Sequence, residues 1–597
     1  MDMADLLVAY LEQLGVEYVF GVPGGAIEPL YNAIARNLRR GGNLNHIVAR
    51  HEAGAAFMAD GYARETGKIG VCISTSGPGA TNMLTAVATA YGNNVPMLVI
   101  TGQPALPSFG KHTLQESACT GIDVLGMFRH CTRYNSLVSH PQQLEWKLIT
   151  ALQHATRSPA GPVHLSVPVD VFRAPSTQSK PNYDMGSLLR PASLVDSGAI
   201  ENLRDMLSGA RNVVILVGGG CGDSIHSILQ FAKLKGATFV TTPDGKGLVS
   251  PQHPLYRGVF GFGGHASAEA ALNDPSVDLI VAVGTSMGEW NTGGWNASLL
   301  NDRLVHIDES EEHLARTPMA RYHLRGSLRA IFDRLIDRIH QAGSHTDPTV
   351  ERRRMARDKA AKHWNPEDML DAPEAFHSDA NPLTPQRLMK ELGELFPHST
   401  RYLADAGNSV AWATHYLQPQ CRRMGERRFG GGDRPREMGK RQSAGGWLRL
   451  TTHFAPMGWA IGAAIGTAAG NPSAPVVCIT GDGSFLMSGQ ELSVAVAEQQ
   501  CVIFVVLNDR ALGMVKHGQR LGGAEQIGYA LPPTDFAAMS RAQGGRGYTI
   551  RSAADLQALD IKSICNYPGP TLLDVYIDPE QVPPMGSRLR VLLDEGQ

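Results

Sequence analysis

The chain has 597 residues, of which 43% are hydrophobic, and a formal net charge of −2. Its length and composition predict several buried cores, most simply three large α/β units. The near-neutral charge provides no general attraction to nucleic acid or to an anionic membrane surface, and no apolar run approaches the roughly 20 residues of a membrane span. Residues 1–5 lack the pattern of a secretory signal, and eight scattered cysteines predict reduced thiols in a cytoplasmic protein.

The first segment, residues 1–175, alternates between strand and helix patterns. Alternation of this kind predicts a parallel sheet with crossover helices. The expected strands are 17–21, 69–74, 97–101 and 163–167, and the expected helices are 2–14, 53–66 and 81–91. The polar stretch 173–191 then predicts a linker.

The second segment, residues 190–340, opens with the run VVILVGGG at 213–220. A glycine-rich turn after a strand is typical of dinucleotide binding, but this one lacks the full spacing and a well-placed acid for a ribose. The alternative is a tight strand-to-helix turn in a Rossmann-like domain without a ligand. From these residues alone we favour that alternative.

Two stretches rich in arginine flank the start of the third segment. Residues 341–380 are charged and predict an interdomain linker with a solvated face. Residues 422–449 contain a run of arginine and glycine that lacks the interleaved aromatic residues of a nucleic-acid surface. We expect that loop to cover a site or to contact another subunit.

The third segment, residues 381–585, carries the most informative pattern. An apolar strand at 475–479 leads into Gly481-Asp482-Gly483-Ser484-Phe485, and a second at 502–507 leads into Asn508-Asp509, with an expected helix at 490–498 between them. Open α/β sheets bind ligands at the carboxyl ends of their strands, and carboxylate, amide and carbonyl oxygens suit Mg²⁺. An ordinary turn with a capping aspartate is the alternative for Gly-Asp-Gly alone.

Three further runs lie in the first segment: VFGVPGGA at 19–26, RHEAGAAFMADGYAR at 50–64 and TSGPGATN at 75–82. Together with the two turns of the third segment, these runs resemble the acetolactate synthase branch of the thiamine-diphosphate enzymes. The resemblance extends from residue 6 to about residue 584. It implies an α/β fold of three Rossmann-like domains with parallel sheets: a pyrimidine-binding domain at 1–175, a central domain at 190–340 and, after the linker 341–380, a diphosphate- and Mg²⁺-binding domain at 381–585.

The resemblance also implies a residue set for thiamine diphosphate and Mg²⁺. Asp482 and Asp509 would bind the metal by side chain and Ala511 by its carbonyl, although the family commonly has asparagine at the second position. Gly483 and Ser484 would add N–H donors at a helix start. The other residues implied to contact the cofactor are Gly25, Glu52, Pro78, Asn82, Gly407, Asn408, Ser409, Ala455, Met457, Gly481, Gly513, Met514 and Val515.

Glu52 and Met457 are the candidates for catalytic residues that contact the cofactor. A carboxylate bonded to the pyrimidine ring nitrogen favours the imino tautomer, whose nitrogen takes the thiazolium C2 proton. Burial is expected to raise the pKa of Glu52, and the alternative role is a helix N-terminal acid. Met457 falls where the family places a bulky side chain between the two cofactor rings; an ordinary core methionine is the alternative.

The resemblance also bears on the residues that would contact the substrate and a flavin. Leu114-Gln115-Glu116 aligns with a family run whose glutamine polarises the 2-oxo acid, so Gln115 is the catalytic candidate on the substrate. His51 and His517 are proton shuttles or structural histidines. Gly518 stands where the biosynthetic enzymes have tryptophan, which predicts a wider acceptor site. The run GTSMGEW at 284–290 replaces the family's flavin-contact run and leaves the binding of FAD open.

The implied activity is that of a carboligase, which decarboxylates a pyruvate-like 2-oxo acid and joins the enamine to a second carbonyl. The alternatives are an acyloin synthase for bulky or aromatic 2-oxo acids, a simple 2-oxo acid decarboxylase, and a catalytically inactive paralogue. In the family, Glu52 and the Asp482 turn would meet from two chains. We therefore expect a homodimer or homotetramer with the site at the subunit interface, and no nucleic-acid or membrane partner.

Overall fold

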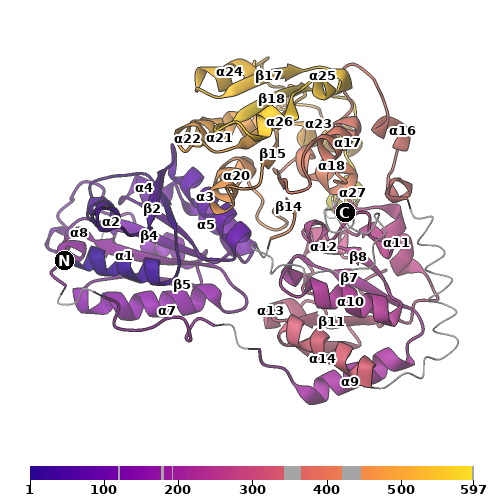
Figure 1. Cartoon of the computed structure of the whole chain (residues 1–597), viewed down its shortest axis with the longest axis horizontal. Coiled ribbons are helices and arrows are strands. Elements are labelled where there is room, and N and C mark those ends of the chain that lie inside the picture. The colour runs from indigo at the N-terminus through magenta and orange to yellow at the C-terminus, as the bar shows by residue number, and fades with distance from the viewer. Residues whose placement is uncertain (119–120, 177–179, 191–192, 342–364, 420–444, 595–597) are drawn as a thin grey trace.

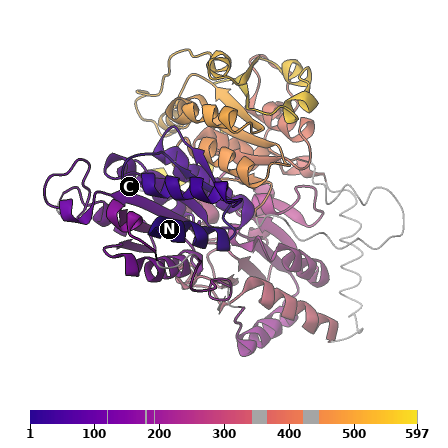
Figure 2. The ribbon, with the colours of Figure 1, turned by 60° about the vertical axis from the view of Figure 1, so that its left-hand side comes forward.

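The computed structural model describes residues 1–118, 121–176, 180–190, 193–341, 365–419 and 445–594. The chain forms three lobes, each built on a six-stranded parallel sheet with helices packed against it (Figure 1, Figure 2). Most strands are runs of aliphatic residues with nearly every side chain buried, as expected for sheets covered on both faces. The predicted fold, α/β with three parallel sheets, is confirmed.

The N-terminal sheet has the strand order β2-β1-β3-β4-β6-β5. Its strands are β1 (Tyr18–Gly21), β2 (Asn45–Val48), β3 (Gly70–Ser74), β4 (Met97–Gln103), β5 (Tyr134–Leu137) and β6 (Pro162–Pro168). Its helices are α1 (Met3–Gln13), α2 (Glu28–Arg39), α3 (Glu52–Thr66), α4 (Pro78–Thr81), α5 (Leu84–Gly92), α6 (Val124–Arg129), α7 (Leu144–Thr156) and α8 (Val169–Arg173). Two hydrophobic cores lie against this sheet, and one of them continues into the C-terminal lobe.

The central sheet has the order β12-β11-β10-β7-β8-β9, the order of a doubly wound Rossmann fold. Its strands are β7 (Val213–Val217), β8 (Thr238–Thr241), β9 (Tyr256–Val259), β10 (Leu279–Val283), β11 (Leu304–Asp308) and β12 (Tyr322–Arg325). Its helices are α9 (Ser197–Gly209), α10 (Ile225–Lys235), α11 (Ala266–Asn273), α12 (Glu289–Thr292), α13 (Glu311–Leu314) and α14 (Leu328–Gln341).

The C-terminal sheet has the order β14-β13-β15-β16-β18-β17. Its strands are β13 (Arg401–Ala404), β14 (Leu448–Arg449), β15 (Val476–Gly481), β16 (Val502–Asn508), β17 (Arg546–Ile550) and β18 (Thr571–Tyr576). The helices of this part of the chain are α16 (Pro373–Phe376), α17 (Pro385–Leu395), α18 (Asn408–Tyr416), α20 (Trp459–Gly470), α21 (Asp482–Ser488), α22 (Leu492–Ala497), α23 (Gly513–Leu521), α24 (Phe536–Ala542), α25 (Ala553–Gln557), α26 (Ile561–Cys565) and α27 (Gly586–Asp594).

The N-terminal and C-terminal sheets share one topology. Numbered by their order along the chain, the strands of both sheets follow the sequence 2-1-3-4-6-5. The central sheet differs, since its first and fourth strands are neighbours. The chain therefore repeats one strand order in its first and third lobes.

Helices α3 and α20 join the N-terminal and C-terminal lobes of the same chain (Figure 1). A Cβ atom on Gly61 of α3 would lie 2.0 Å from the Ala463 carbonyl oxygen, and one on Gly466 of α20 would lie 1.8 Å from the Met58 carbonyl oxygen. Glycine at these positions lets the two helix backbones touch. The small-residue sequence of α20, WAIGAAIGTAAG, is thus explained by close helix packing.

Two predicted helices differ from the observed ones. The helix expected at 81–91 is divided into α4 and α5, because the Met83 N–H bonds to the Ala80 carbonyl in a tighter turn. The helix expected at 490–498 is only the last part of a longer helical segment, in which α21 starts directly at Asp482 and a 3₁₀ turn η6 (Gly489–Glu491) precedes α22. The break follows Ser488, whose φ of −135° is not helical.

Two predicted stretches lie mainly or partly outside the described residues. The linker expected at 341–380 is described only from residue 365 onward, apart from residue 341, and the arginine- and glycine-rich loop at 422–449 only from residue 445 onward. Among the helices that the structure describes, we find none long and apolar enough to cross a membrane.

Candidate active site

The candidate metal and diphosphate residues lie at the carboxyl edge of the C-terminal sheet. Strands β13, β15 and β16 are parallel neighbours, with Ala404 beside Ile479 and Gly481 beside Leu507. The residues that follow these strands therefore emerge at one edge of the sheet. The adjacency explains why three turns that are far apart in the sequence approach one another.

Asp482, which is buried, and Asp509, which is half-buried, form an acidic pair at this edge. One carboxylate oxygen of Asp482 accepts the Gly483 N–H at 2.7 Å, while the other is buried without a hydrogen-bond partner. Asp509 Oδ1 accepts the Ala511 N–H at 3.2 Å. Burial raises the pKa of Asp482 to about 6, and burial together with the neighbouring Asp482 raises the pKa of Asp509 to about 7. A bound dication would relieve both effects, because it stabilises the ionised forms.

The site has few protein groups that could bind a metal ion, as is typical of Mg²⁺ sites in which phosphate supplies some of the ligands. Within the described residues, no group of three or more His, Cys, Asp or Glu side chains could hold a metal ion. The available donors are two carboxylates and the carbonyl of the buried Ala511. Mg²⁺ commonly binds through one or two carboxylates and completes its shell with phosphate and water. The donor set therefore fits a metal bound together with a diphosphate.

The turns around this pair have the features of a diphosphate site. Asn408 Oδ1 and Ser484 Oγ are buried without hydrogen-bond partners, like the free oxygen of Asp482. Gly407 has a φ of +101°, and no atom lies within 4 Å of a Cβ placed on it. Helix α18 begins at Asn408, so its first N–H groups lie at this edge and would stabilise an anion bound there.

Gly513, at the start of α23, closes the same edge. A Cβ on Gly513 would lie 2.3 Å from Asn408 Nδ2 and 2.7 Å from Asp509 Oδ2, so glycine allows this helix start to approach both side chains. Met514 is half-buried against the third core and Val515 is exposed. The structure thus brings the start of α23 together with Asn408 and Asp509.

Met457 lies beside the Gly-Asp-Gly turn. Its Cε is 3.3 Å from a Cβ placed on Gly483, and Ala455 is half-buried two residues before it. The backbone after Met457 is fixed by Asp405, whose carboxylate accepts the N–H groups of Gly458 at 2.9 Å and Ala460 at 3.2 Å.

Asp405 was not among the predicted site residues. It is fully buried, burial raises its pKa to about 6, and it also accepts the Thr480 hydroxyl at 2.9 Å. It therefore connects β13, β15 and the start of α20. An aspartate directly after an apolar strand was a signal in the sequence that could have identified it.

The candidate pyrimidine residues lie at the carboxyl edge of the N-terminal sheet. Glu52 is the first residue of α3, and its Oε2 accepts a hydrogen bond from Asn82 Nδ2 at 2.9 Å. A Cβ on Gly79 would lie 3.4 Å from Glu52 Oε1. Gly25 and Pro78 are exposed on the turns that follow β1 and β3 at this same edge.

Gln115 lies on a loop held against the β3 turn. Its Cβ is 3.0 Å from a Cβ placed on Gly77, and its own φ is +60°, the left-handed region. The buried Ser117 fixes the loop, because its hydroxyl accepts the Gly77 N–H at 3.0 Å and a hydrogen bond from Gln103 Nε2 at 2.9 Å. Gln103 and Ser117 were not predicted, since neither belongs to a recognisable motif.

The two histidines proposed as shuttles have structural contacts. His51 Nδ1 accepts the Ala53 N–H at 3.1 Å and so caps α3. His517 is 1% exposed, and burial together with the charges of Arg520 and Lys516 lowers its pKa to about 4. His517 is therefore uncharged at neutral pH. Next to it, a Cβ on Gly518 would meet no atom within 4 Å.

A hollow of about 420 Å³ lies where the three lobes meet, next to the glycine-rich turn of the central sheet. A Cβ on Gly219 of that turn would lie 2.7 Å from Asp244 Oδ2. The same hollow is lined by Asp308 and Glu309. The lining also includes arginine and histidine side chains, so an anionic dinucleotide at the turn would face both signs of charge.

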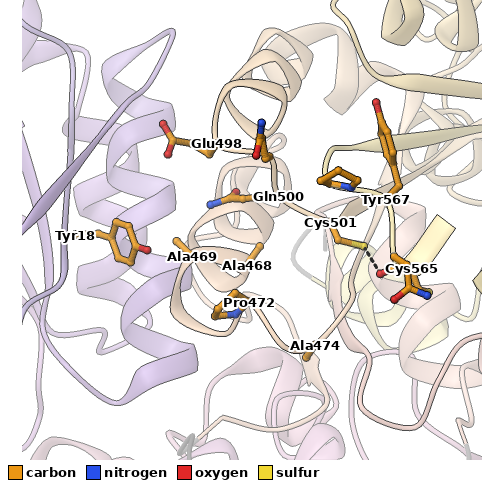
Figure 3. A pocket seen from close by; sticks show the side chains of 13 residues that line it. Tyr18, Ala468, Ala469, Pro472, Ala474, Glu498, Gln500, Cys501, Cys565 and Tyr567 are labelled. Atoms are coloured by element: carbon orange, nitrogen blue, oxygen red, sulfur yellow. Dashed lines mark hydrogen bonds between the residues drawn. The ribbon is translucent and has the colours of Figure 1, made fainter. Parts of the chain in front are cut away.

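A second hollow, of about 310 Å³, is lined by residues of the N-terminal and C-terminal lobes (Figure 3). It is lined by Tyr18 at the start of β1 and by Cys501 just before β16, and Cys501 Sγ donates to the Cys565 carbonyl at 3.3 Å. These residues are at the amino ends of the strands, whereas Asp482 and Asp509 follow the carboxyl ends. This hollow does not belong to the candidate active site.

Comparison with known proteins identifies the family. Residues 1–124 match the thiamine pyrophosphate enzyme N-terminal TPP binding domain, residues 200–335 its central domain and residues 436–575 its C-terminal TPP binding domain. The chain is 31% identical to a putative acetolactate synthase large subunit of Mycobacterium tuberculosis, over 97% of this chain and 98% of the relative. It is 30% identical to the acetolactate synthase isozyme 2 large subunit of Escherichia coli, over 99% of both chains.

A probable acetolactate synthase large subunit of Methanococcus aeolicus is 30% identical over the full length of this chain and 96% of its own. The similarity to synthases does not favour the alternatives of a simple decarboxylase or an acyloin synthase for bulky substrates. The chain therefore belongs to the thiamine pyrophosphate enzymes, as a carboligase-type member of the acetolactate synthase large-subunit branch.

Proposed function

We propose that this enzyme decarboxylates pyruvate or a similar small 2-oxo acid and joins the remaining two-carbon unit to the carbonyl of a second 2-oxo acid. The observation that carries the proposal is the group of buried, unpartnered oxygens of Asp482, Ser484 and Asn408 beside Asp509. Leaving three buried polar atoms unpaired is costly, so their presence at one sheet edge supports a bound polar group. Thiamine diphosphate supplies a thiazolium carbon that adds to 2-oxo acids and accepts the electron pair released with CO₂.

Mg²⁺ is held, in this proposal, by the side chains of Asp482 and Asp509 and by the carbonyl of Ala511. The diphosphate is held by Gly407, Asn408, Ser409, Gly481, Gly483, Ser484 and Gly513, with Met514 and Val515 at its edge. The raised pKa values of the two aspartates support this role, because a dication converts a costly pair of buried carboxylates into ligands.

Glu52 binds the pyrimidine ring nitrogen and holds a proton there, which sets the tautomer of the ring. Its accessible position at the start of α3 and its contact with Asn82 support this role. Gly25, Pro78 and Asn82 line the ring, and Ala455 and Met457 hold the bent shape of the cofactor. Gln115 donates a hydrogen bond to the substrate carbonyl. Flavin has no part in this proposal.

The active site lies between two copies of the chain, with Glu52 from one protomer and Asp482 from its partner, in a homodimer or homotetramer. Exposed apolar side chains beside both halves support such an interface: Leu486 and Met487 on α21 are 42% and 57% exposed, and Leu114 beside Gln115 is 84% exposed. Patches of this kind mark interaction surfaces. The six cysteines described as free thiols accord with the cytoplasmic location that we also propose.

The test is incubation with pyruvate, thiamine diphosphate and Mg²⁺ while CO₂ and acetolactate are both measured. Acetolactate in the wild type, and none in the Glu52→Gln variant, is the expected result. CO₂ release without acetolactate would contradict the carboligase assignment for pyruvate. Sedimentation of the holoenzyme as a monomer with full activity would contradict the shared site.

A further inference from the structure

The first turn of α3, which carries Glu52, is held by a carboxylate from the C-terminal lobe. Glu491, the last residue of η6, accepts the Arg50 N–H on Oε2 at 3.0 Å and the His51 N–H on Oε1 at 2.9 Å. These two N–H groups immediately precede Glu52 in the chain. A single side chain therefore fixes two successive peptide units next to the proposed catalytic carboxylate.

This contact is buried and closely fitted. Glu491 is 1% exposed, and a Cβ on Gly54 of α3 would lie 2.4 Å from its Oε1. Glycine at position 54 thus leaves the space that the carboxylate occupies. A buried carboxyl group of this kind is costly unless it makes hydrogen bonds, which here come from the α3 turn.

A second residue of the same segment strengthens the contact. Arg50 Nε donates to Ser493 Oγ at 2.8 Å, and Arg50 Nη1 donates to the Val48 carbonyl at 2.8 Å. The segment from Glu491 to Ser493 therefore holds both the backbone and the side chain of the residues before Glu52. Because side-chain direction at a helix start follows the backbone, this arrangement sets where the Glu52 carboxylate points.

We propose that Glu491 is a positioning residue for Glu52, directing its carboxylate toward the pyrimidine ring of the cofactor. This inference rests on the proposed role of Glu52. Glu491 itself touches neither the metal pair nor Asn82 and Gly79, which surround Glu52. Its effect is therefore on activation of the cofactor and leaves the binding of the cofactor's diphosphate unchanged.

The experiment compares the holoenzyme forms of the wild type, Glu491→Gln, Glu52→Gln and Glu498→Gln. Three quantities are measured: the affinity for thiamine diphosphate with Mg²⁺, the rate of hydrogen–deuterium exchange at the thiazolium C2, and, on the protein without cofactor, amide exchange of a peptide covering residues 48–56. Glu498 is the matched control, since it is an exposed glutamate on the same stretch of chain.

Glutamine at 491 keeps the shape but leaves only one acceptor oxygen and turns an N–H₂ group toward the α3 turn. We expect C2 exchange to slow on the order of 10- to 100-fold, because small displacements of a catalytic group have effects of this size. Amide exchange of residues 48–56 should increase, and cofactor affinity should stay within about threefold of wild type. Glu498→Gln should behave as wild type in all three.

Wild-type C2 exchange in Glu491→Gln, with faster amide exchange at residues 48–56, would overturn the inference and leave Glu491 a structural contact. A loss of cofactor affinity equal to the loss of exchange rate would also overturn it. If Glu491→Gln does not fold, Glu491→Asp keeps the carboxyl group and withdraws it by one carbon, and slower C2 exchange is again required. Unchanged exchange in Glu52→Gln would instead contradict the proposed function.

Discussion

The N-terminal and C-terminal sheets have one strand order but different chemistry at their carboxyl edges. The edge of the C-terminal sheet holds two carboxylates with raised pKa values and three buried polar oxygens without partners. At the edge of the N-terminal sheet, Glu52 is the first residue of α3, and its carboxylate accepts a hydrogen bond from Asn82. One topology thus serves two tasks, because the turns after the strands, rather than the strands, carry the ligands.

This comparison predicts that mutations at the two edges impair different properties: cofactor binding at the C-terminal sheet and catalytic rate at the N-terminal sheet. Asp482→Asn removes a charge from the acidic pair and should abolish Mg²⁺-dependent binding of thiamine diphosphate, with activity reduced on the order of 10³-fold or more. Calorimetric titration with the cofactor, with and without Mg²⁺, measures the effect. Glu525→Gln, on an exposed loop, is the control. Undiminished affinity in Asp482→Asn would show that the two edges are not specialised in this way.

A mutation at the edge of the N-terminal sheet should slow catalysis without weakening the binding of the cofactor. Glu52→Gln is expected to slow C2 exchange and turnover by about 10²-fold or more, as for loss of an acid–base group, while cofactor affinity stays within a few-fold of wild type. Parallel measurement of affinity and exchange rate separates the two properties. A variant that loses affinity as severely as Asp482→Asn would remove the distinction between the edges.

Adding one methyl group tests the close packing of α3 against α20, which joins the N-terminal and C-terminal lobes. Gly466→Ala places a carbon 1.8 Å from the Met58 carbonyl oxygen and should destabilise the protein by about 1–3 kcal/mol, as overpacking does. Urea unfolding of the protein without cofactor gives the free energy. In Gly209→Ala, at the end of α9, no atom lies within 4 Å of the new carbon, so the same change should be nearly neutral. Equal stability of both variants would contradict the close packing of α3 and α20.

The acidic pair also predicts a dependence on pH. Because the pKa values of Asp482 and Asp509 are raised to about 6 and 7, the folded protein without metal binds protons more tightly than the unfolded chain does. Their contribution to stability is present below about pH 4 and is lost as the pH rises through about 7. Mg²⁺ competes with these protons, so its affinity should rise by about tenfold per pH unit between pH 6 and 7, where one of the two groups is protonated. Affinity that is flat from pH 5.5 to 7.5 would contradict these shifts.

The smallest expected effect concerns the acceptor. The space beside Gly518 is open, so Gly518→Trp should be accommodated and should narrow the site. We expect turnover with a larger second 2-oxo acid to fall a few-fold relative to turnover with pyruvate, in line with the discrimination that small volume differences give. Competition between pyruvate and 2-oxobutyrate as acceptors measures the ratio. A uniform loss for both acceptors would count against a role for Gly518 in selectivity.

The residue patterns alone predicted a parallel sheet in the first lobe, some of the strands and the turns that carry the candidate ligands. They could do so because apolar runs, glycine turns and acidic residues after strands are local signals, and parallel strands place those turns at one edge. The family resemblance, carried by Glu52, the Asp482 turn and the residues Asn508-Asp509, gave the division into three lobes and was confirmed by comparison with known proteins.

Other features were decided only by the tertiary structure. Glu491 binds a backbone N–H group 441 residues away, and that donor is positioned only once the N-terminal and C-terminal lobes have packed together. Asp405 binds a backbone N–H group 53 residues away, at the start of α20. Ser117 and Gln103 hold the Gln115 loop through side chains that no motif contains. The break between α4 and α5 and the early start of α21 likewise depend on local bonding that residue patterns do not specify. Sequence patterns show which polar residues follow a strand. The packing of segments that are distant in the sequence decides which buried carboxyl group binds the backbone of those turns and holds it in place.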